Sequence, residues 1–561
     1  MTINDFFQSL NRNFQAQGAV YQRKVAKPIK SLPKKLWPSF YILLTLAWAM
    51  AYFVSLPPLN WQSLDTWGFF IPLVGSYIFL HYLHRTITHP YLPAKQVFKP
   101  VKLYLKAVAI LFFIGLLVLF FTSPIFNAKA YSRLITPHEG KFEKAITETK
   151  IEQVPIIDRG TAQRLGNRKL GTITDLVSQF EPSPAYTQIN VANKPVRVSP
   201  LRYAGFFKWL ANSKQGIPNY LSVDMTDGEV KLMKPRQAMK YTESEYFFRQ
   251  IDRYLRFNYP TKIFGHPSFE VDDKGDPYYI ATTYRKNFLL RSMEPNGAVL
   301  VNAMDGSHHF YNLKDIPNWV DRVYSSKIVV NQLNQHGLFK NGFFNSILAK
   351  KGATKTTKGY NYIVLNDDVW LYTGITSVTS DDSNIGFVLT NMRTKETKQF
   401  NVPAAEEYSA MQSAQGAVQE KSYKSTFPIL INKNNRPTYI MSLKDKAGLV
   451  KMYAMVDAQD YQKVATGSSL QAVMANYDQS HLANSSDEDE KEEQKTITGI
   501  LEDKQSVVID GKTVYYLLID GEVYYAPVSI NDRLPFVQKG QKLSLKVDHK
   551  KKAHEVKLET N

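Results

Sequence analysis

Three long apolar stretches lie near the start of the chain, whereas the remainder alternates between short apolar and polar runs. The stretch 107–126 contains no ionisable side chain. A helix of about twenty residues rises about 30 Å, which matches the hydrocarbon core of a bilayer. The two earlier stretches are similarly apolar and are flanked by aromatic residues. The pattern predicts a membrane anchor over 37–126 with three transmembrane helices, at about 37–56, 67–83 and 107–126.

Basic residues flank these helices unevenly. Residues 1–36 hold seven lysines and arginines against one aspartate, and residues 85–106 hold five without an acid, whereas the connector 59–66 has none. Because basic segments stay in the cytoplasm, we expect residues 1–36 to be a basic cytoplasmic segment lying on the bilayer surface. An odd number of spans then places everything after residue 126 outside. The predicted location is the cell membrane, multi-pass, with a cytoplasmic N-terminus and extracellular C-terminal domains.

Charge and composition narrow the classes of function. The chain has 561 residues and a formal net charge of +19, of which the two basic flanking segments supply more than half. The positive charge of these two segments is explained by their place beside the membrane helices. It is therefore not evidence for nucleic-acid binding, and we expect no nucleic-acid partner. The absence of cysteine excludes disulfides, thiolate nucleophiles and cysteine-based metal sites. A hydrophobic content of 44% is enough to bury sizeable cores.

Beyond the membrane, the pattern predicts an α+β fold. Residues 127–155 are polar and mixed in charge, which suggests a helical stalk, and residues 156–483 read as one or more extracytoplasmic α+β domains. Asp158 begins a predicted helix to about Phe180, and Thr242 to Glu245 form a capping box for a helix to about Phe257.

Short alternating runs with Asp-Gly or Lys-Gly turns predict antiparallel hairpins. Helix followed by hairpins, more than once, indicates repeated small units. The predicted hairpins, strands and one further helix cover residues 186–198, 220–232, 269–281, 298–311, 362–365, 369–373, 385–389, 404–419 (the helix), 426–432, 437–443 and 449–457.

Two of these hairpins carry a resemblance. Tyr220-Leu-Ser-Val-Asp-Met-Thr-Asp-Gly-Glu-Val and Val299-Leu-Val-Asn-Ala-Met-Asp-Gly look like the strand–turn–strand of PepSY-type extracytoplasmic modules. The resemblance implies a helix packed on the hairpin and a role in inhibiting or tethering proteases near the bacterial envelope. The chain as a whole resembles uncharacterised Gram-positive multispan membrane proteins with a large extracytoplasmic domain.

The C-terminal part reads as a separate unit. Residues 484–495 hold six acids and two lysines without an apolar side chain, which predicts a solvated acidic linker. Residues 496–561 predict a small β-barrel of OB or SH3 type, with strands at 496–501, 506–509, 514–519, 522–527 and 542–547. Its candidate ligand contacts are Tyr515, Tyr516, Tyr524 and Tyr525, although adjacent tyrosines on a strand face opposite ways, so one of each pair is expected in the core.

No catalytic signature stands out. Gly-x-Ser-x-Gly, His-Glu-x-x-His and P-loop motifs are absent from the sequence. His81 and His84 share a helix face, as metal ligands can, but interfacial packing is the simpler explanation. His308 and His309 point opposite ways on a strand, which favours a hairpin edge over a metal site. We therefore predict no catalytic, cofactor-binding or metal residues and no cofactor.

These observations predict a membrane-anchored extracytoplasmic binding or regulatory protein of the bacterial cell envelope. Its expected partners are the lipid bilayer and an envelope protein or anionic cell-wall polymer. Two alternatives stay open. One is a non-enzymatic subunit of a membrane transport or channel complex, and the other is an envelope enzyme with a carboxylate-based site.

Overall fold

The computed structural model describes residues 34–89, 93–148, 154–192, 194–287, 291–379, 383–484, 495–509, 512–548 and 551–558. The chain divides into two compact units, Met1–Tyr477 and Asp478–Asn561. The predicted cytoplasmic segment up to residue 33 and residues 485–494 of the predicted acidic linker lie outside the described residues.

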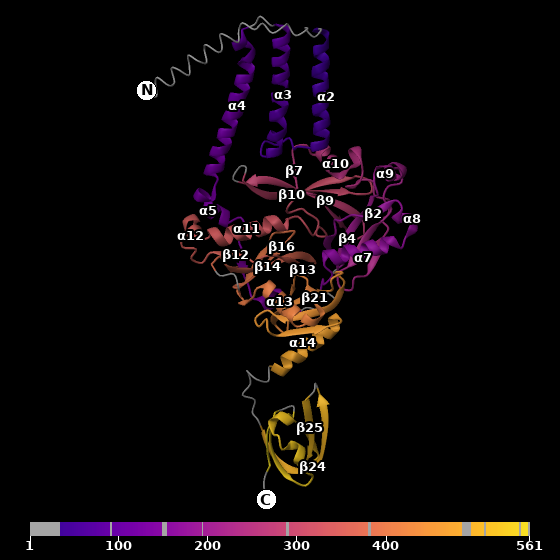
Figure 1. The fold of residues 1–561 in the computed structure, drawn as a ribbon, viewed down its shortest axis with the longest axis vertical. Helices are drawn as coiled ribbons and strands as arrows, with labels where there is room; N and C mark the ends of the chain where they lie inside the picture. The colour runs from indigo at the N-terminus through magenta and orange to yellow at the C-terminus, as the bar shows by residue number, and fades with distance from the viewer. Residues whose placement is uncertain are drawn as a thin grey trace. The chain divides into compact units, whose positions relative to one another are not determined.

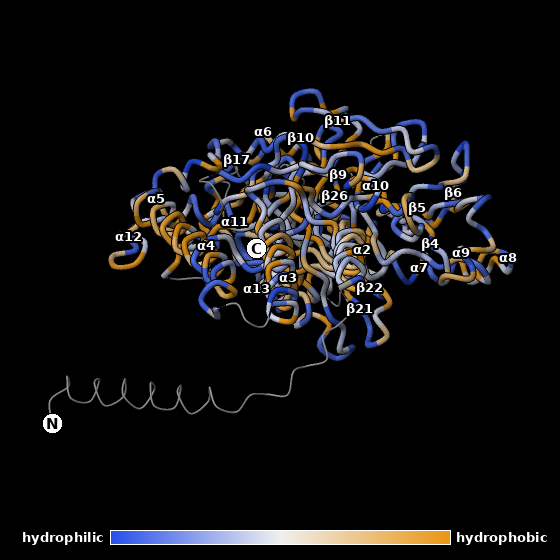
Figure 2. The backbone as a smooth tube through the Cα atoms, turned by 90° about the horizontal axis from the view of Figure 1, so that it is seen from above, coloured by the Kyte–Doolittle hydropathy of each residue, from blue (hydrophilic) through white to orange (hydrophobic). Residues whose placement is uncertain are grey.

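Three N-terminal helices are long and apolar enough to cross a membrane, as the sequence predicts. They are α2 (Trp37–Ser55), α3 (Leu64–Thr88) and α4 (Ala94–Phe121), and Figure 2 shows them almost end-on with apolar residues in orange. The third differs most from its predicted bounds. It begins before residue 107, continues through Pro100, and ends at Phe121 because a new helix starts at Pro124.

The three helices pack through small and polar side chains, as is usual in lipid. The indole N–H of Trp48 on α2 donates to Ser76 on α3 over 2.9 Å. The Tyr104 hydroxyl on α4 donates to the Ile71 carbonyl over 2.8 Å. Gly75 permits this approach, since a Cβ there would lie 2.6 Å from the Tyr104 hydroxyl oxygen.

The predicted helical stalk is wrong. This stretch instead forms short elements attached to the β-rich part of the same unit, which follows residue 154 and which we name the body. They are α5 (Pro124–Ser132), β1 (His138–Glu139) and α6 (Phe142–Ala145). Strand β1 pairs in parallel with β17 (Thr397–Phe400). Phe142 and Ile146 are buried, so their apolar side chains hold this segment in the core rather than in solvent.

Among the described residues, the body contains four large sheets that follow one another along the chain and are antiparallel apart from the β1–β17 pair. In each, four strands form a meander in chain order, and a fifth short strand pairs with the extended second strand. The first sheet contains β2 (Phe180–Pro182), β3 (Thr187–Val191), β4 (Lys194–Tyr203), β5 (Tyr220–Asp224) and β6 (Val230–Met233). The second contains β7 (Ile263–Phe264), β8 (Ser268–Val271), β9 (Pro277–Asn287), β10 (Ser292–Asn302) and β11 (His308–Asn312).

The third and fourth sheets repeat this plan. The third contains β12 (Thr354–Thr356), β13 (Asn361–Leu365), β14 (Asp368–Ser377), β16 (Gly386–Asn391) and β17, joined by β1. The fourth contains β19 (Lys424–Ser425), β20 (Ile429–Lys433), β21 (Arg436–Lys444), β22 (Val450–Asp457) and β23 (Val464–Gly467). A separate two-stranded ladder pairs β15 (Ser383–Asn384) with β18 (Ala404–Ala405).

A helix precedes each sheet, so helix plus sheet repeats four times (Figure 1). These helices are α7 (Arg159–Gly171), α10 (Ile251–Asn258), α11 (Ser326–Phe339) and α13 (Glu407–Gly416). The described part of this unit also contains α8 (Thr174–Val177), α9 (Phe206–Asn212), α12 (Phe343–Ile347) and the first half of α14 (Leu470–Asn484), with the 3₁₀ turns η1 (Lys34–Leu36), η3 (Phe247–Arg249) and η4 (Gln419–Lys421).

Neighbouring sheets contact one another in chain order. Strand β3 of the first sheet contacts β8 of the second, and β13 of the third contacts β20 of the fourth. The second and third sheets share one apolar cluster. The fourth returns to the first repeat through Lys444, whose ammonium lies 2.7 Å from the carboxylate of Asp158.

Most predicted hairpins are confirmed, whereas several predicted helices are shorter. The hairpin β5–β6 turns at Asp227-Gly228, where the φ of +81° is one that glycine adopts without strain. Asp158 does cap α7 by accepting from the Thr161 N–H, but that helix ends at Gly171 instead of Phe180. The helix predicted at 404–419 spans only α13, because residues 404–405 form β18.

The capping box predicted at Thr242–Glu245 is wrong. Helix α10 starts at Ile251, where the Gln250 side chain caps it by accepting from the Arg253 N–H. Both Thr242 and Glu245 are buried, and the Glu245 carboxylate binds side chains distant in sequence. The local pattern predicts that the Glu245 carboxylate caps a helix, but in the folded protein it binds Tyr203 and Trp209 instead.

The second unit contains one five-stranded antiparallel sheet, ordered β26-β25-β24-β27-β28, and the end of α14 (Leu470–Asn484). Its strands are β24 (Lys495–Ile509), β25 (Lys512–Ile519), β26 (Glu522–Pro527), β27 (Lys542–Val547) and β28 (Ala553–Leu558); η5 (Val528–Ile530) and η6 (Leu534–Phe536) follow β26.

Strand β24 pairs with β27 through its first half and with β25 through its second half. The two strands predicted at 496–501 and 506–509 are therefore one, because a bulge after Leu501 bends the strand without ending it. A parallel bridge between Tyr525 and Lys552 brings β26 next to the start of β28.

Candidate functional site

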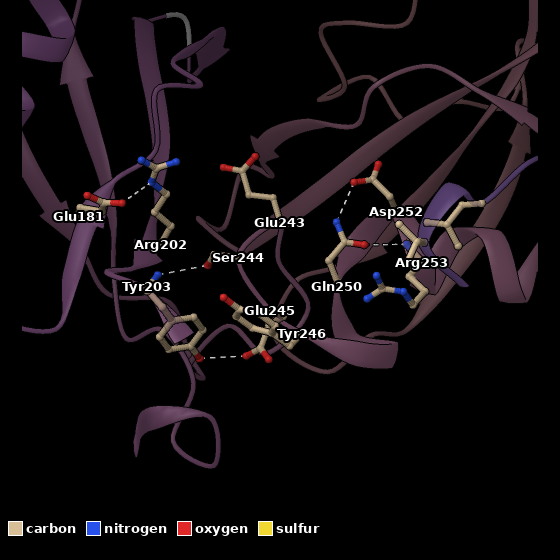
Figure 3. Close-up of a pocket in the computed structure, with 13 residues that line it drawn as sticks. Glu181, Arg202, Tyr203, Glu243, Ser244, Glu245, Tyr246, Gln250, Asp252 and Arg253 are labelled. Carbon is tan, nitrogen blue, oxygen red and sulfur yellow. Dashed lines mark hydrogen bonds and ion pairs between the residues drawn. The ribbon is translucent and has the colours of Figure 1, made fainter. Parts of the chain in front are cut away.

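A cavity of about 670 Å³ lies between the end of α2 and the first sheet. Val54 and Leu56 form its apolar wall, and polar side chains from β2, β4 and the segment 243–253 form the rest (Figure 3). These residues are separated by up to two hundred positions in the sequence. Local patterns therefore could not assemble the cavity, and we name it the membrane-proximal pocket.

The body is fixed to the end of α2 by hydrogen bonds from α10. The Arg253 guanidinium donates to the Phe53 carbonyl over 3.1 Å and lies 4.1 Å from the centre of the Phe53 ring. The Arg256 guanidinium donates to the Leu56 carbonyl over 2.9 Å. Burial lowers the pKa of both arginines. These contacts hold the pocket at the point where the first span ends.

Glu245 supports the floor of the pocket. Its carboxylate accepts from the Tyr203 hydroxyl over 2.9 Å and from the Trp209 indole N–H over 2.7 Å. The Arg249 guanidinium lies 3.2 Å from it. Burial, and then the Glu245 charge, raise the pKa of Tyr203. With three partners, this carboxylate serves the structure and is not available to a ligand.

Glu243 and Asp252 are pocket carboxylates that accept hydrogen bonds from uncharged groups. Glu243 accepts from the Ser183 hydroxyl, and Asp252 accepts from the Gln250 side-chain amide over 2.8 Å. Among the described residues neither forms an ion pair, whereas Arg202 is 2.9 Å from Glu181. Arg253 also lines the pocket and offsets one of these two charges, so a single negative charge is left, which suits a cationic group such as an ammonium.

A second cavity, of about 590 Å³, lies where β13 and β20 approach residues 144–147 and 154–155. Nearby, the N–H of Asp321 donates to the carboxylate of Glu270 over 3.0 Å, and the N–H of Asn190 donates to Asp321 over 2.6 Å. Burial raises the pKa of Glu270 to about 7. Burial, and then the Glu270 charge, raise the pKa of Asp321. This is a buried acidic pair at the centre of the body.

Three of the histidines weighed as metal ligands, His84, His308 and His309, have ordinary packing partners. The His84 ring stacks on Trp37 with centroids 4.4 Å apart. The His308 ring hydrogen-bonds the Tyr259 hydroxyl over 2.8 Å, and the His309 ring packs on Tyr311. In the part of the chain that the structure describes, no three histidine, aspartate or glutamate residues are grouped as metal ligands.

The four tyrosines of the second unit divide between core and surface. Tyr524 is buried in the apolar core, and Tyr515 packs against that core. Tyr516 is 37% exposed and faces Tyr525 on the neighbouring strand, with ring centroids 6.4 Å apart. Burial raises the pKa of Tyr525. Of the four predicted ligand contacts, Tyr516 and Tyr525 are therefore the two that lie side by side toward the surface.

Comparisons with known proteins give no family. No protein-family model and no curated protein matches the chain. Among solved structures, a levansucrase mutant from B. megaterium aligns over 75% of this chain and 97% of its own, with 9% identity and a TM-score of 0.17. An exo-1,5-alpha-L-arabinanase from a bovine ruminal metagenomic library aligns over 68% and 100%, with 10% identity and a TM-score of 0.15. At TM-scores this low, neither likeness indicates a shared fold or activity.

Proposed function

We propose that the chain is a membrane-anchored extracytoplasmic binding or regulatory protein of the cell envelope, with its N-terminus in the cytoplasm. Three helices suited to spanning a membrane and the basic segments around them support this placement. The observation that carries the proposal is the membrane-proximal pocket, which joins an apolar wall from the first span to uncommitted carboxylates of the body.

The pocket favours an amine-bearing group of an envelope component. Glu243 and Asp252 supply negative charge, and the rings of Tyr203 and Tyr246 supply faces on which a cation can rest. The predicted anionic wall polymer remains a proposal, supported by the share of the net positive charge that lies outside the two basic flanking segments. The pocket itself would instead bind a positively charged part of a partner protein or polymer.

The second unit would provide another binding surface. A five-stranded antiparallel sheet in which the long first strand pairs with the second and the fourth supports the predicted OB-type barrel. In that fold, strands two and three carry ligands, and Tyr516 and Tyr525 lie on those strands. An extended sugar or peptide segment of the wall is the ligand that this surface would fit.

The PepSY resemblance remains a proposal. The two hairpins that carry it, β5–β6 and β10–β11, are the third and fourth strands of successive sheets, and α7 contacts the first of them. A role in tethering or inhibiting an envelope protease would be compatible with the amine-binding pocket, because peptide N-termini and lysine side chains are cationic.

Photocrosslinking in living cells tests the proposal. A photoreactive amino acid in place of Tyr246, in the pocket wall, should form an adduct with an envelope component. The double substitution Glu243→Gln/Asp252→Asn should reduce that adduct, since it removes the charge that holds the amine. The same photoreactive residue at Tyr408, an exposed position on α13, is the control. Adducts with cytosolic proteins alone, or an adduct unchanged in the double variant, would contradict the proposal.

An envelope enzyme is the second candidate, because Glu243 and Asp252 line one cavity and paired carboxylates can act as acid and base. Incubating the purified chain with cell-wall fragments and following their masses separates the two. Product formation that is lost in Glu243→Gln would favour the enzyme, and binding without mass change would favour the binding protein.

A further inference from the structure

An exposed row of apolar side chains continues from the first span onto the surface of the body. It comprises Phe207 and Leu210 of α9 with Phe247 and Phe248 of η3, and we name it the aromatic rim. Their exposed fractions are 80%, 58%, 55% and 61%, which match the 63–66% of Met50 and Val54 in the span itself. Large apolar side chains so exposed and so close together indicate an interaction surface.

Ring contacts connect the rim to the span without a break. Phe53 of α2 packs against Phe248 with centroids 5.6 Å apart, and against Phe257 of α10 at 6.3 Å. On the other side of η3, Phe247 packs against Trp209 of α9 at 5.8 Å. Figure 1 shows α10 directly beyond the end of α2, with α9 beside it. The rim therefore begins at the level where a transmembrane helix leaves the bilayer.

The backbone of η3 keeps both phenylalanines at the surface. Phe247 has a φ of +52°, a left-handed conformation that a bulky side chain rarely adopts. Glu245, two residues earlier, is anchored in the interior by Tyr203 and Trp209. After the anchored Glu245, the turn places the rings of both Phe247 and Phe248 at the surface. In a regular element, one of two consecutive side chains would ordinarily point into the core.

We propose that the aromatic rim inserts into the bilayer leaflet that the body faces, so that the body is held against the membrane by its own surface as well as by the spans. Short amphipathic segments lie in the interface with their apolar side about 5–10 Å into the headgroup and acyl boundary. Basic side chains beside the rim, Lys208 and Lys214, suit contact with anionic headgroups.

The exit of the third span shows the same chemistry. Phe344, Ile347 and Leu348, in and just after α12, are 68%, 54% and 77% exposed. Helix α12 contacts α5, whose exposed Phe126 packs on Phe121 at the end of α4 with centroids 5.9 Å apart. Lysines at 340, 350 and 351 flank this second apolar group. The body thus carries lipid-facing side chains beside both outer spans.

This insertion has a consequence for the membrane-proximal pocket. Tyr246 lines the pocket and lies next to Phe247 of the rim, and its ring packs on Trp209 at 4.7 Å. A rim buried in the leaflet would bring the pocket mouth to headgroup level. Insertion does not depend on the identity of the pocket ligand, so the two proposals can fail separately.

The absence of cysteine permits a direct test in the full chain. Phe207→Cys would be labelled with an environment-sensitive fluorophore and reconstituted into phosphatidylglycerol nanodiscs containing a lipid with a doxyl quencher near its headgroup. Tyr408→Cys on α13 is the matched aromatic control at the end of the body away from the spans (Figure 1). We expect the label at 207 to be quenched several-fold more strongly than the label at 408.

Equal quenching at 207 and 408 would overturn the proposal. So would a label at 207 that is shielded from aqueous iodide but not quenched by doxyl lipid, because a protein partner or a second copy would then cover the rim. Phe207 is 80% exposed, so its replacement removes little packing. Leu210→Cys provides a second site with the same expected result.

Discussion

Replacing Glu270 by glutamine should remove much of the pH dependence of the body's stability. Glu270 lies on β8 with its side chain fully buried, where its carboxylate accepts from the Asp321 N–H over 3.0 Å and from the Ser268 hydroxyl over 2.9 Å. Burial is the main reason that its pKa rises to about 7. Hydrogen bonds from the Asp321 N–H and the Ser268 hydroxyl, together with the charge of Arg322, lower this pKa without offsetting the effect of burial.

The sign of the effect follows from proton binding. Between pH 4.5 and about 7 the folded protein keeps a proton on Glu270 that the unfolded chain has lost. Stability therefore falls as pH rises through this window and levels off above it. Each pKa unit corresponds to 1.36 kcal/mol, so the window is worth about 3 kcal/mol. Glu270→Gln stays neutral, keeps one acceptor oxygen and leaves Asp321 without a like-charged neighbour.

Urea unfolding of the detergent-solubilised chain at pH 5 to 8, followed by tryptophan fluorescence, measures this. Between pH 5 and pH 8 the wild-type free energy of unfolding should fall by about 2.5 kcal/mol more than that of Glu270→Gln, and the variant should be the more stable protein at pH 8. The exposed Glu143→Gln is the matched control and should follow the wild type. Parallel pH profiles for Glu270→Gln and wild type would refute the account of a buried, destabilising carboxylate.

Three further predictions test particular contacts. Gly337→Ala in α11 should destabilise the body by about 1–3 kcal/mol in the same unfolding assay, because the new Cβ would lie 2.2 Å from the Thr354 carbonyl oxygen; an unchanged midpoint would contradict this packing. Asp158→Ala removes the cap of α7 and the ion-pair partner of Lys444 on β21, so the free energy of unfolding should fall by about 1–2 kcal/mol. An unchanged free energy of unfolding would show that the cap is not formed. Tyr524→Ala should destabilise the second unit by about 3–5 kcal/mol, as judged by its proteolysis, whereas the half-exposed Tyr516→Ala should leave it folded; equal effects would show that the faces are assigned wrongly.

Features encoded locally were predictable from the sequence. Each spanning helix is a continuous apolar run, and its existence needs no partner. The hairpins carry their own turn signals, such as Asp305-Gly306, whose glycine has a φ of +77°. The boundaries were less predictable. Helix α4 extends well before residue 107 because the basic connector is helical too.

Features that depend on distant partners were not predictable. The capping-box pattern at Thr242–Glu245 fails because the carboxylate binds Tyr203 and Trp209, and no local rule weighs those partners. The stalk fails because Phe142 is buried among residues that come much later in the chain. The membrane-proximal pocket draws Glu243 and Asp252 together with Val54, and only the folded chain brings them to one cavity.

The central claim is that the body lies outside the cytoplasmic membrane. Single-cysteine variants of this cysteine-free chain, treated with a membrane-impermeant maleimide on intact cells, test it most directly. Gln412→Cys on exposed α13 should be labelled without permeabilisation, and Gln96→Cys in the basic connector only after it. Labelling of Gln96→Cys in intact cells, with Gln412→Cys protected until the membrane is opened, would contradict the account.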